Sequence, residues 1–132
     1  MNEQRAIQFL TEVRKPLLAL HKAILDHERA SYEAEYGPTT AASFLQVLIN
    51  GEAFRWITPL STVIANIDET LDDKEATADD RIGAAQAVTA LFGNEGMQQA
   101  FLERYRALLQ QSPAVLHEHG RVAQVLRTVE AA

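Results

Sequence analysis

The residues best suited to chemistry are His21, Glu28, Arg29, Tyr32 and Asp68. His21, Glu28 and Tyr32 follow one another at spacings of seven and four, so they share one side of a helix, and Arg29 is next to Glu28. If a second helix carrying Asp68 packs antiparallel to the first, we expect its carboxylate to reach His21 or Arg29. A histidine flanked by carboxylates in a half-buried cleft can serve as a general base or as part of a metal site.

The same residues also have a structural interpretation. Polar side chains at the edge of an apolar helical stripe commonly form a hydrogen-bonded network or a surface ion pair. Trp56, the single tryptophan, is likewise either a core anchor at a helix corner or a platform for an interface or a ligand. The sequence leaves these alternatives open, and it identifies no catalytic, cofactor-binding or metal-ligating residue.

Motifs with a specific chemistry are missing from the chain. No histidine follows a glutamate by three residues, which is the spacing of di-iron bundles. The sequence has no cysteine, which excludes thiol catalysis and cysteine-based metal sites. It also has no phosphate-binding glycine loop and no Gly-x-Ser-x-Gly motif. We therefore expect no cofactor, and an enzyme is the less favoured class.

The elements that must position these side chains are helices. Apolar residues recur every three or four positions along nearly the whole chain, which predicts an all-α protein: a compact bundle of about six helices in one domain, residues 1–132. The first helix is predicted over 3–36 and buries Ala6, Leu10, Val13, Leu17, Leu20 and Ile24. Pro16 lies inside it, so we expect a kink near Thr11–Lys15, or two helices that meet there.

Capping residues and glycines predict the other boundaries. Thr39–Thr40 begins a short helix that ends at Asn50–Gly51, and Glu52–Arg55 forms a turn. Further helices begin at the pairs Thr58–Pro59 and Ser112–Pro113, at the capping-box sequence Thr77-x-x-Asp80, and at Met97 after a glycine-rich break at 93–96.

The charge is uneven along the chain. The net charge is −6, and the acidic segment 69–80, expected to be mainly a solvated loop, holds six carboxylates and one lysine. There is no basic stripe of the kind that binds nucleic acid. No apolar run approaches a membrane span, and the first residues do not resemble a secretory signal. We therefore expect a cytoplasmic protein that binds neither nucleic acid nor membranes.

Two segments, LHKAILDHERASYE (20–33) and FRWITPLSTVIANIDE (54–69), resemble small bacterial helical proteins that have no known activity. The resemblance covers roughly the first half of the chain. It implies a bacterial cytoplasmic origin and draws attention to His21, Glu28, Trp56, Pro59 and Asp68, but it implies no substrate or cofactor.

Two functional hypotheses follow. The first is a small non-enzymatic interaction or regulatory protein, a homodimer or the partner of another protein, that pairs through its long first helix. The alternative is a helical bundle that binds a ligand or a metal, and that could be an enzyme, through a His21/Glu28/Asp68 cluster.

Overall fold

All regular structure in the described part of the chain is helical. The computed structural model describes residues 1–93 and 99–130. Its elements are α1 (Glu3–Tyr36), α2 (Ala41–Asn50), the 3₁₀ helix η1 (Glu52–Ile57), α3 (Thr58–Asp72), α4 (Ala78–Phe92), α5 (Gln99–Gln111) and α6 (Pro113–Glu130). The prediction of an all-α bundle of about six helices is confirmed. The predicted start of the fifth helix at Met97, and most of the break at 93–96, lie outside the described residues.

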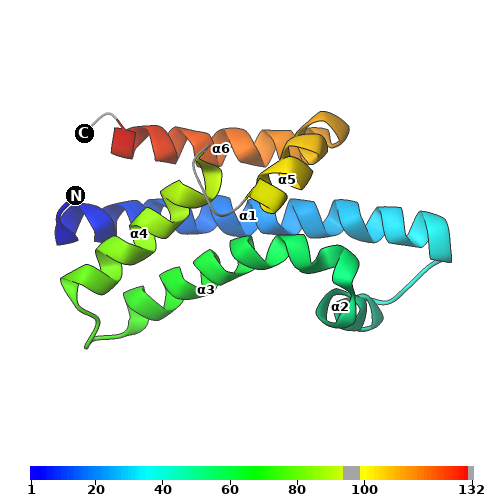
Figure 1. Cartoon of the computed structure of the whole chain (residues 1–132), viewed down its shortest axis with the longest axis horizontal. Coiled ribbons are helices and arrows are strands. Elements are labelled where there is room, and N and C mark those ends of the chain that lie inside the picture. Colours follow the sequence, from blue (N-terminus) through cyan, green and yellow to red (C-terminus); the bar gives the residue numbers. More distant parts are fainter. Residues whose placement is uncertain (94–98, 131–132) are drawn as a thin grey trace.

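Helix α1 is the centre of the bundle. Figure 1 shows it between α6 on one side and α3 on the other, with α4 crossing it, and it packs against all three. Its inward face is the predicted stripe, every member of which is fully buried: Ala6, Leu10, Val13, Leu17, Leu20 and Ile24. The three-to-four spacing therefore places the apolar side of α1 inside this chain.

Helix α1 passes through Pro16 as one helix. The alternative of two helices meeting at that position is therefore wrong, while the size of any local bend stays a prediction. The Pro16 ring is buried on the inward side of α1. Packing on both sides of the helix compensates for the stability that is lost with the backbone hydrogen bond that a proline removes.

Three of the predicted helix starts are capped as expected. The hydroxyls of Thr40 and Ser112 accept hydrogen bonds from the backbone of their first turns. Thr77 and Asp80 form a reciprocal capping box at the start of α4. Thr58 is different: it is already helical and caps nothing by its side chain, because η1 runs directly into α3. The predicted turn at Glu52–Arg55 is therefore part of a helix.

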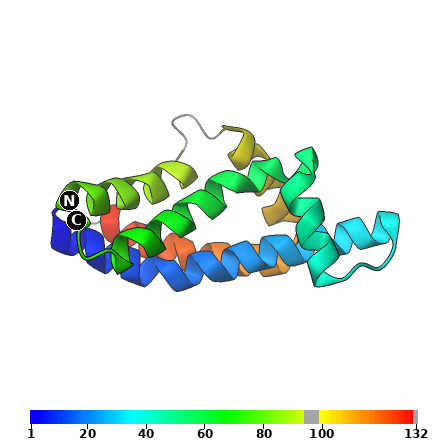
Figure 2. The ribbon, with the colours of Figure 1, turned by 90° about the horizontal axis from the view of Figure 1, so that it is seen from below.

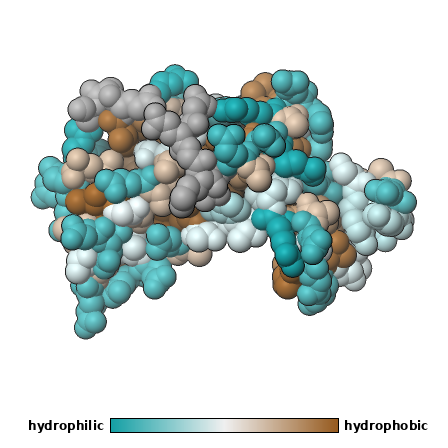
Figure 3. All heavy atoms as spheres, in the orientation of Figure 1, coloured by the Kyte–Doolittle hydropathy of each residue, from teal (hydrophilic) through white to brown (hydrophobic). Residues whose placement is uncertain are grey.

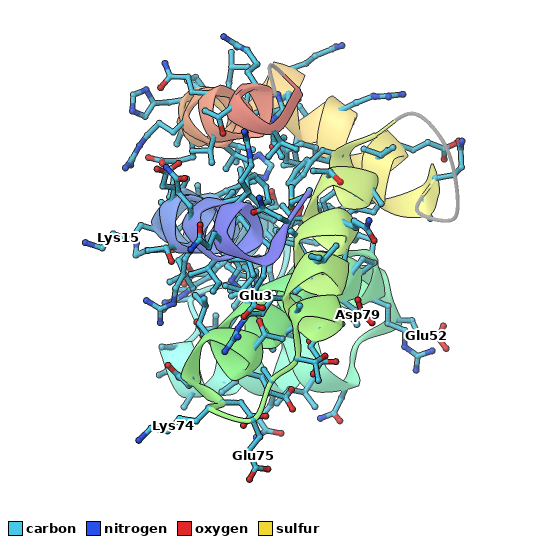
Figure 4. All side chains as sticks on the ribbon, turned by 90° about the vertical axis from the view of Figure 1, so that its left-hand side faces the viewer. Glu3, Lys15, Glu52, Lys74, Glu75 and Asp79 are labelled. Atoms are coloured by element: carbon cyan, nitrogen blue, oxygen red, sulfur yellow. The ribbon has the colours of Figure 1, made fainter. Side chains whose placement is uncertain are left out.

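The connection between α3 and α4 is shorter than the predicted acidic loop. It spans only 73–77, because Asp72 ends α3 and Asp79 and Asp80 belong to α4. Figure 4 shows Lys74 and Glu75 pointing away from the bundle there. Arg81 of α4 instead turns inward and pairs with Glu3 of α1, with 2.7 Å between Nη1 and Oε1. This pair ties the start of α1 to α4.

Helix α2 lies apart from the main bundle. Figures 1 and 2 show it at the end of the molecule towards which α1 runs, outside the group formed by α1, α3, α4 and α6. Only one of its residues, Phe44, is buried. The loop before it is held by Arg29, whose Nη2 donates to the carbonyl oxygen of Thr39 at 2.6 Å.

Candidate interaction groove

A groove between α2 and the bundle forms a large hollow in the described surface. It has a volume of about 720 Å³, which is within the usual size of binding pockets. It is lined by His21 and Leu25 of α1, Leu45, Leu48 and Ile49 of α2, Phe54, Arg55 and Ile57 of η1, and Thr58, Pro59 and Ser61 of α3. Four helical elements thus contribute to one continuous, mainly apolar surface.

The α2 wall of the groove exposes large apolar side chains. Leu45 is 53% exposed and Ile49 is 66% exposed. Figure 3 shows hydrophobic surface over α2, at the lower right of the view. Ala41–Asn50 contains no charged residue, so no charge on this helix favours contact with water. A concentrated apolar patch of this kind is typical of an interaction surface.

The groove also contains a polar pair. His21 Nε2 of α1 lies 2.9 Å from Ser61 Oγ of α3, which is hydrogen-bonding distance. Burial lowers the pKa of His21, because the charged ring would lose water on that side. The imidazole is therefore neutral near pH 7 and offers one donor and one acceptor.

Arg55 is the only other titratable residue among those that line the groove. Its contact with Glu52, 4.0 Å from Nη1 to Oε1, joins side chains that are 73% and 85% exposed. Such an exposed pair contributes little and leaves the guanidinium available. No carboxylate lines the groove, although the chain has 18 acidic residues.

Asp68 does not join His21. Helices α1 and α3 do pack antiparallel, as the hypothesis required, but the register places Asp68 opposite Arg14 and Ser61 opposite His21. Arg14 and His21 are seven residues apart, which is about 10 Å along a helix. Asp68 forms an ion pair with Arg14, and the Nε of Arg29 lies 3.5 Å from Glu33 Oε1 instead.

Glu28 and Tyr32 are also separate from His21. Their side chains line a smaller hollow of about 370 Å³, which shares only Phe54 with the residues that line the groove. Glu28 Oε1 is 3.9 Å from His27 Nδ1, and Tyr32 packs against Phe44 with 5.7 Å between ring centroids. The structure therefore does not bring His21, Glu28 and Asp68 together, and within the described residues no group of three such side chains could hold a metal ion.

Trp56 joins η1 to α5. Its ring lies 5.9 Å from that of Phe101, and the guanidinium of Arg104 lies 5.7 Å from its centroid. The ring is partly buried against the core and is not among the residues that line the groove. This position corresponds to the anchoring role that the sequence left open. Pro59, which the resemblance also indicated, does line the groove.

Sequence reasoning missed a partly buried polar pair between α5 and α6. The hydroxyl of Tyr105 on α5 lies 2.6 Å from Nδ1 of His119 on α6. Burial raises the pKa of Tyr105 and lowers that of His119. His119 follows the buried Val115 by four residues and precedes the buried Val122 by three, so this spacing could have indicated that it faces inward.

Comparisons of the chain with family models, with curated proteins and with solved structures find no match. None of the described helices combines the length and the apolar character that crossing a bilayer requires. Because the comparisons find no match, the functional proposal is based on the groove and the residues that line it.

Proposed function

We propose that this protein is a small, non-enzymatic interaction protein that forms a homodimer through the α2 face of the groove. The observation that carries the proposal is the exposure of Leu45 and Ile49 on a helix that the other described residues leave largely uncovered. A bacterial cytoplasmic setting belongs to the same proposal and is supported by the resemblance of segments 20–33 and 54–69.

The pairing surface is α2 and not α1. The sequence suggested α1 because its apolar stripe is so long, but that stripe is buried against α3, α4 and α6. Among the described residues, α2 exposes two large apolar side chains side by side, Leu45 and Ile49.

Two features favour a second copy of the chain as the occupant. The face offers both an exposed ridge, Leu45 and Ile49, and a hollow beside it, which suits a two-fold interface where one patch meets itself. In addition, α2 carries no charge, so two copies of an acidic chain can approach there without placing like charges opposite each other.

Substitution of Leu45 tests the proposal. In light scattering over a micromolar concentration series, the wild type should be dimeric, and Leu45→Glu should weaken dimerisation at least about tenfold. A buried leucine contributes about 1.5–3 kcal/mol, and a tenfold change in affinity corresponds to about 1.4 kcal/mol.

Leu116→Glu is the matched control. Leu116 is 52% exposed on α6 and is not among the groove residues, so the same change there should leave the dimer intact. A wild type that remains monomeric at these concentrations, or equal effects of the two substitutions, would contradict the proposal.

A further inference from the structure

The groove has the composition of a site for an amphiphilic molecule. Its walls are apolar side chains from α1, α2 and η1, among them Leu25, Leu48 and Phe54. Its volume of about 720 Å³ is sufficient for a small organic ligand. This inference rests on the proposed function, because it uses the same groove. A small molecule that binds there would affect dimerisation.

The polar groups that border the groove favour an anion over a cation. Arg55 supplies a guanidinium that is paired only weakly with Glu52, and guanidinium is well suited to carboxylates. No acidic side chain lines the groove. The carboxylate that contacts Arg55, that of Glu52, is 85% exposed and lies outside the lining, so water screens its repulsion of a bound anion. A groove lined by one guanidinium and no carboxylate therefore differs from the chain as a whole, whose net charge is −6.

The His21–Ser61 pair gives the groove a second polar point, between α1 and α3. A neutral imidazole bonded to a hydroxyl leaves hydrogen-bonding capacity on the Ser61 oxygen and on the ring without adding charge. The alkyl chain of a ligand can lie against the apolar walls while its charged head group stays near Arg55.

We propose that the groove binds an aliphatic monocarboxylate, with the alkyl chain against the leucines of α1 and α2 and the carboxylate at Arg55, and that this ligand competes with the second copy of the chain. Because Leu45 and Ile49 belong both to the ligand site and to the dimer face, occupation by the ligand excludes pairing. The carboxylate thereby controls the oligomeric state.

The test uses decanoate below its micelle-forming concentration, titrated into the full-length protein by calorimetry. Decanol, which has no charge, and decyltrimethylammonium, which has the opposite charge, serve as comparison ligands. Decanoate should bind saturably and more tightly than both. Arg55→Gln should weaken decanoate about fivefold, the scale of an exposed charge pair, and leave decanol unchanged. Arg127→Gln, at an exposed position on α6, is the matched control and should change nothing.

Light scattering with and without decanoate tests the competition. The ligand should convert dimer to monomer over the concentration range in which it binds. Binding without a change in oligomeric state overturns the competition, and absence of saturable binding, or equal binding by Arg55→Gln, overturns the ligand site. A protein that is monomeric from the start contradicts the proposed dimer and, with it, the competition, while the titration still tests the carboxylate site by itself.

Discussion

At the scale of single residues, the core contains a hydrogen bond that depends on the protonation of a histidine. Tyr105 is almost fully buried, and its hydroxyl keeps its proton because burial raises its pKa. The hydroxyl can then donate to Nδ1 of His119, which accepts only while the ring is neutral. This bond links α5 to α6 in a region where an unpaired hydroxyl would be costly.

This arrangement predicts that the protein loses stability on mild acidification. The pKa of His119 is lower in the folded chain than in the unfolded chain, so unfolding takes up protons. The stabilisation is complete above the ordinary histidine pKa, about 6.5, and is lost as the pH falls through the lower folded value. The melting temperature should therefore fall between pH 7.5 and pH 5.5.

His119→Gln isolates that contribution, because glutamine still accepts from Tyr105 but does not titrate. The fall in melting temperature should be smaller in this variant than in the wild type. His21→Gln is a second variant with the same expected effect, a smaller fall in melting temperature, because burial also lowers the pKa of His21. Identical pH profiles for the wild type and for both variants would contradict the assignment.

At the scale of elements, the same capping chemistry has different consequences in different helices. Thr40 caps α2, which is peripheral, while Thr77 caps α4, which packs on α1 and α3. A cap contributes to global stability only when its helix is part of the cooperative core.

We therefore expect Thr77→Ala to lower the free energy of unfolding by about 1 kcal/mol, within the range measured for lost caps. Thr40→Ala should leave the global unfolding free energy nearly unchanged and instead speed amide exchange within α2. Denaturant titration and hydrogen exchange measure the two effects. Equal global losses would show that α2 unfolds together with the bundle.

The elements also show what the sequence could and could not predict. The stripe from Ala6 to Ile24, and the caps at Thr40, Thr77 and Ser112, depend on local spacing, and the structure confirms them. The pairing of Asp68 depends on the register between α1 and α3, which packing along the whole helices decides. The groove depends on where α2 docks, and the periodicity of Leu45, Leu48 and Ile49 indicates only that they share one side of a helix.

At the scale of the whole molecule, the chain divides into a cooperative core and an attached helix. One continuous cluster of buried residues includes the stripe of α1 and residues from η1, α3, α4, α5 and α6, but none from α2. Chains of this length commonly unfold in a single transition. Because few of its residues are buried, α2 is able to open locally without that transition.

Matched leucine substitutions in the two parts test this division. Leu20 is fully buried in α1, and Leu20→Ala should cost about 2–5 kcal/mol through the lost contacts and the cavity left behind. Because α1 contacts α3, α4 and α6, slowly exchanging amides in all four helices should lose the same protection. Amides of α2 should change little, since they already exchange through local opening.

Leu48→Ala, in the α2 wall of the groove, should have the opposite pattern. It removes the same atoms from a partly exposed site, so protection should fall in α2 and stay constant in α1, α3, α4 and α6. Hydrogen exchange monitored by NMR on the Leu45→Glu background, at a concentration at which light scattering shows a monomer, separates this effect from dimerisation. If Leu48→Ala lowers protection throughout the bundle, α2 belongs to the cooperative core, and its exposed leucines then require an explanation other than an attached interaction helix.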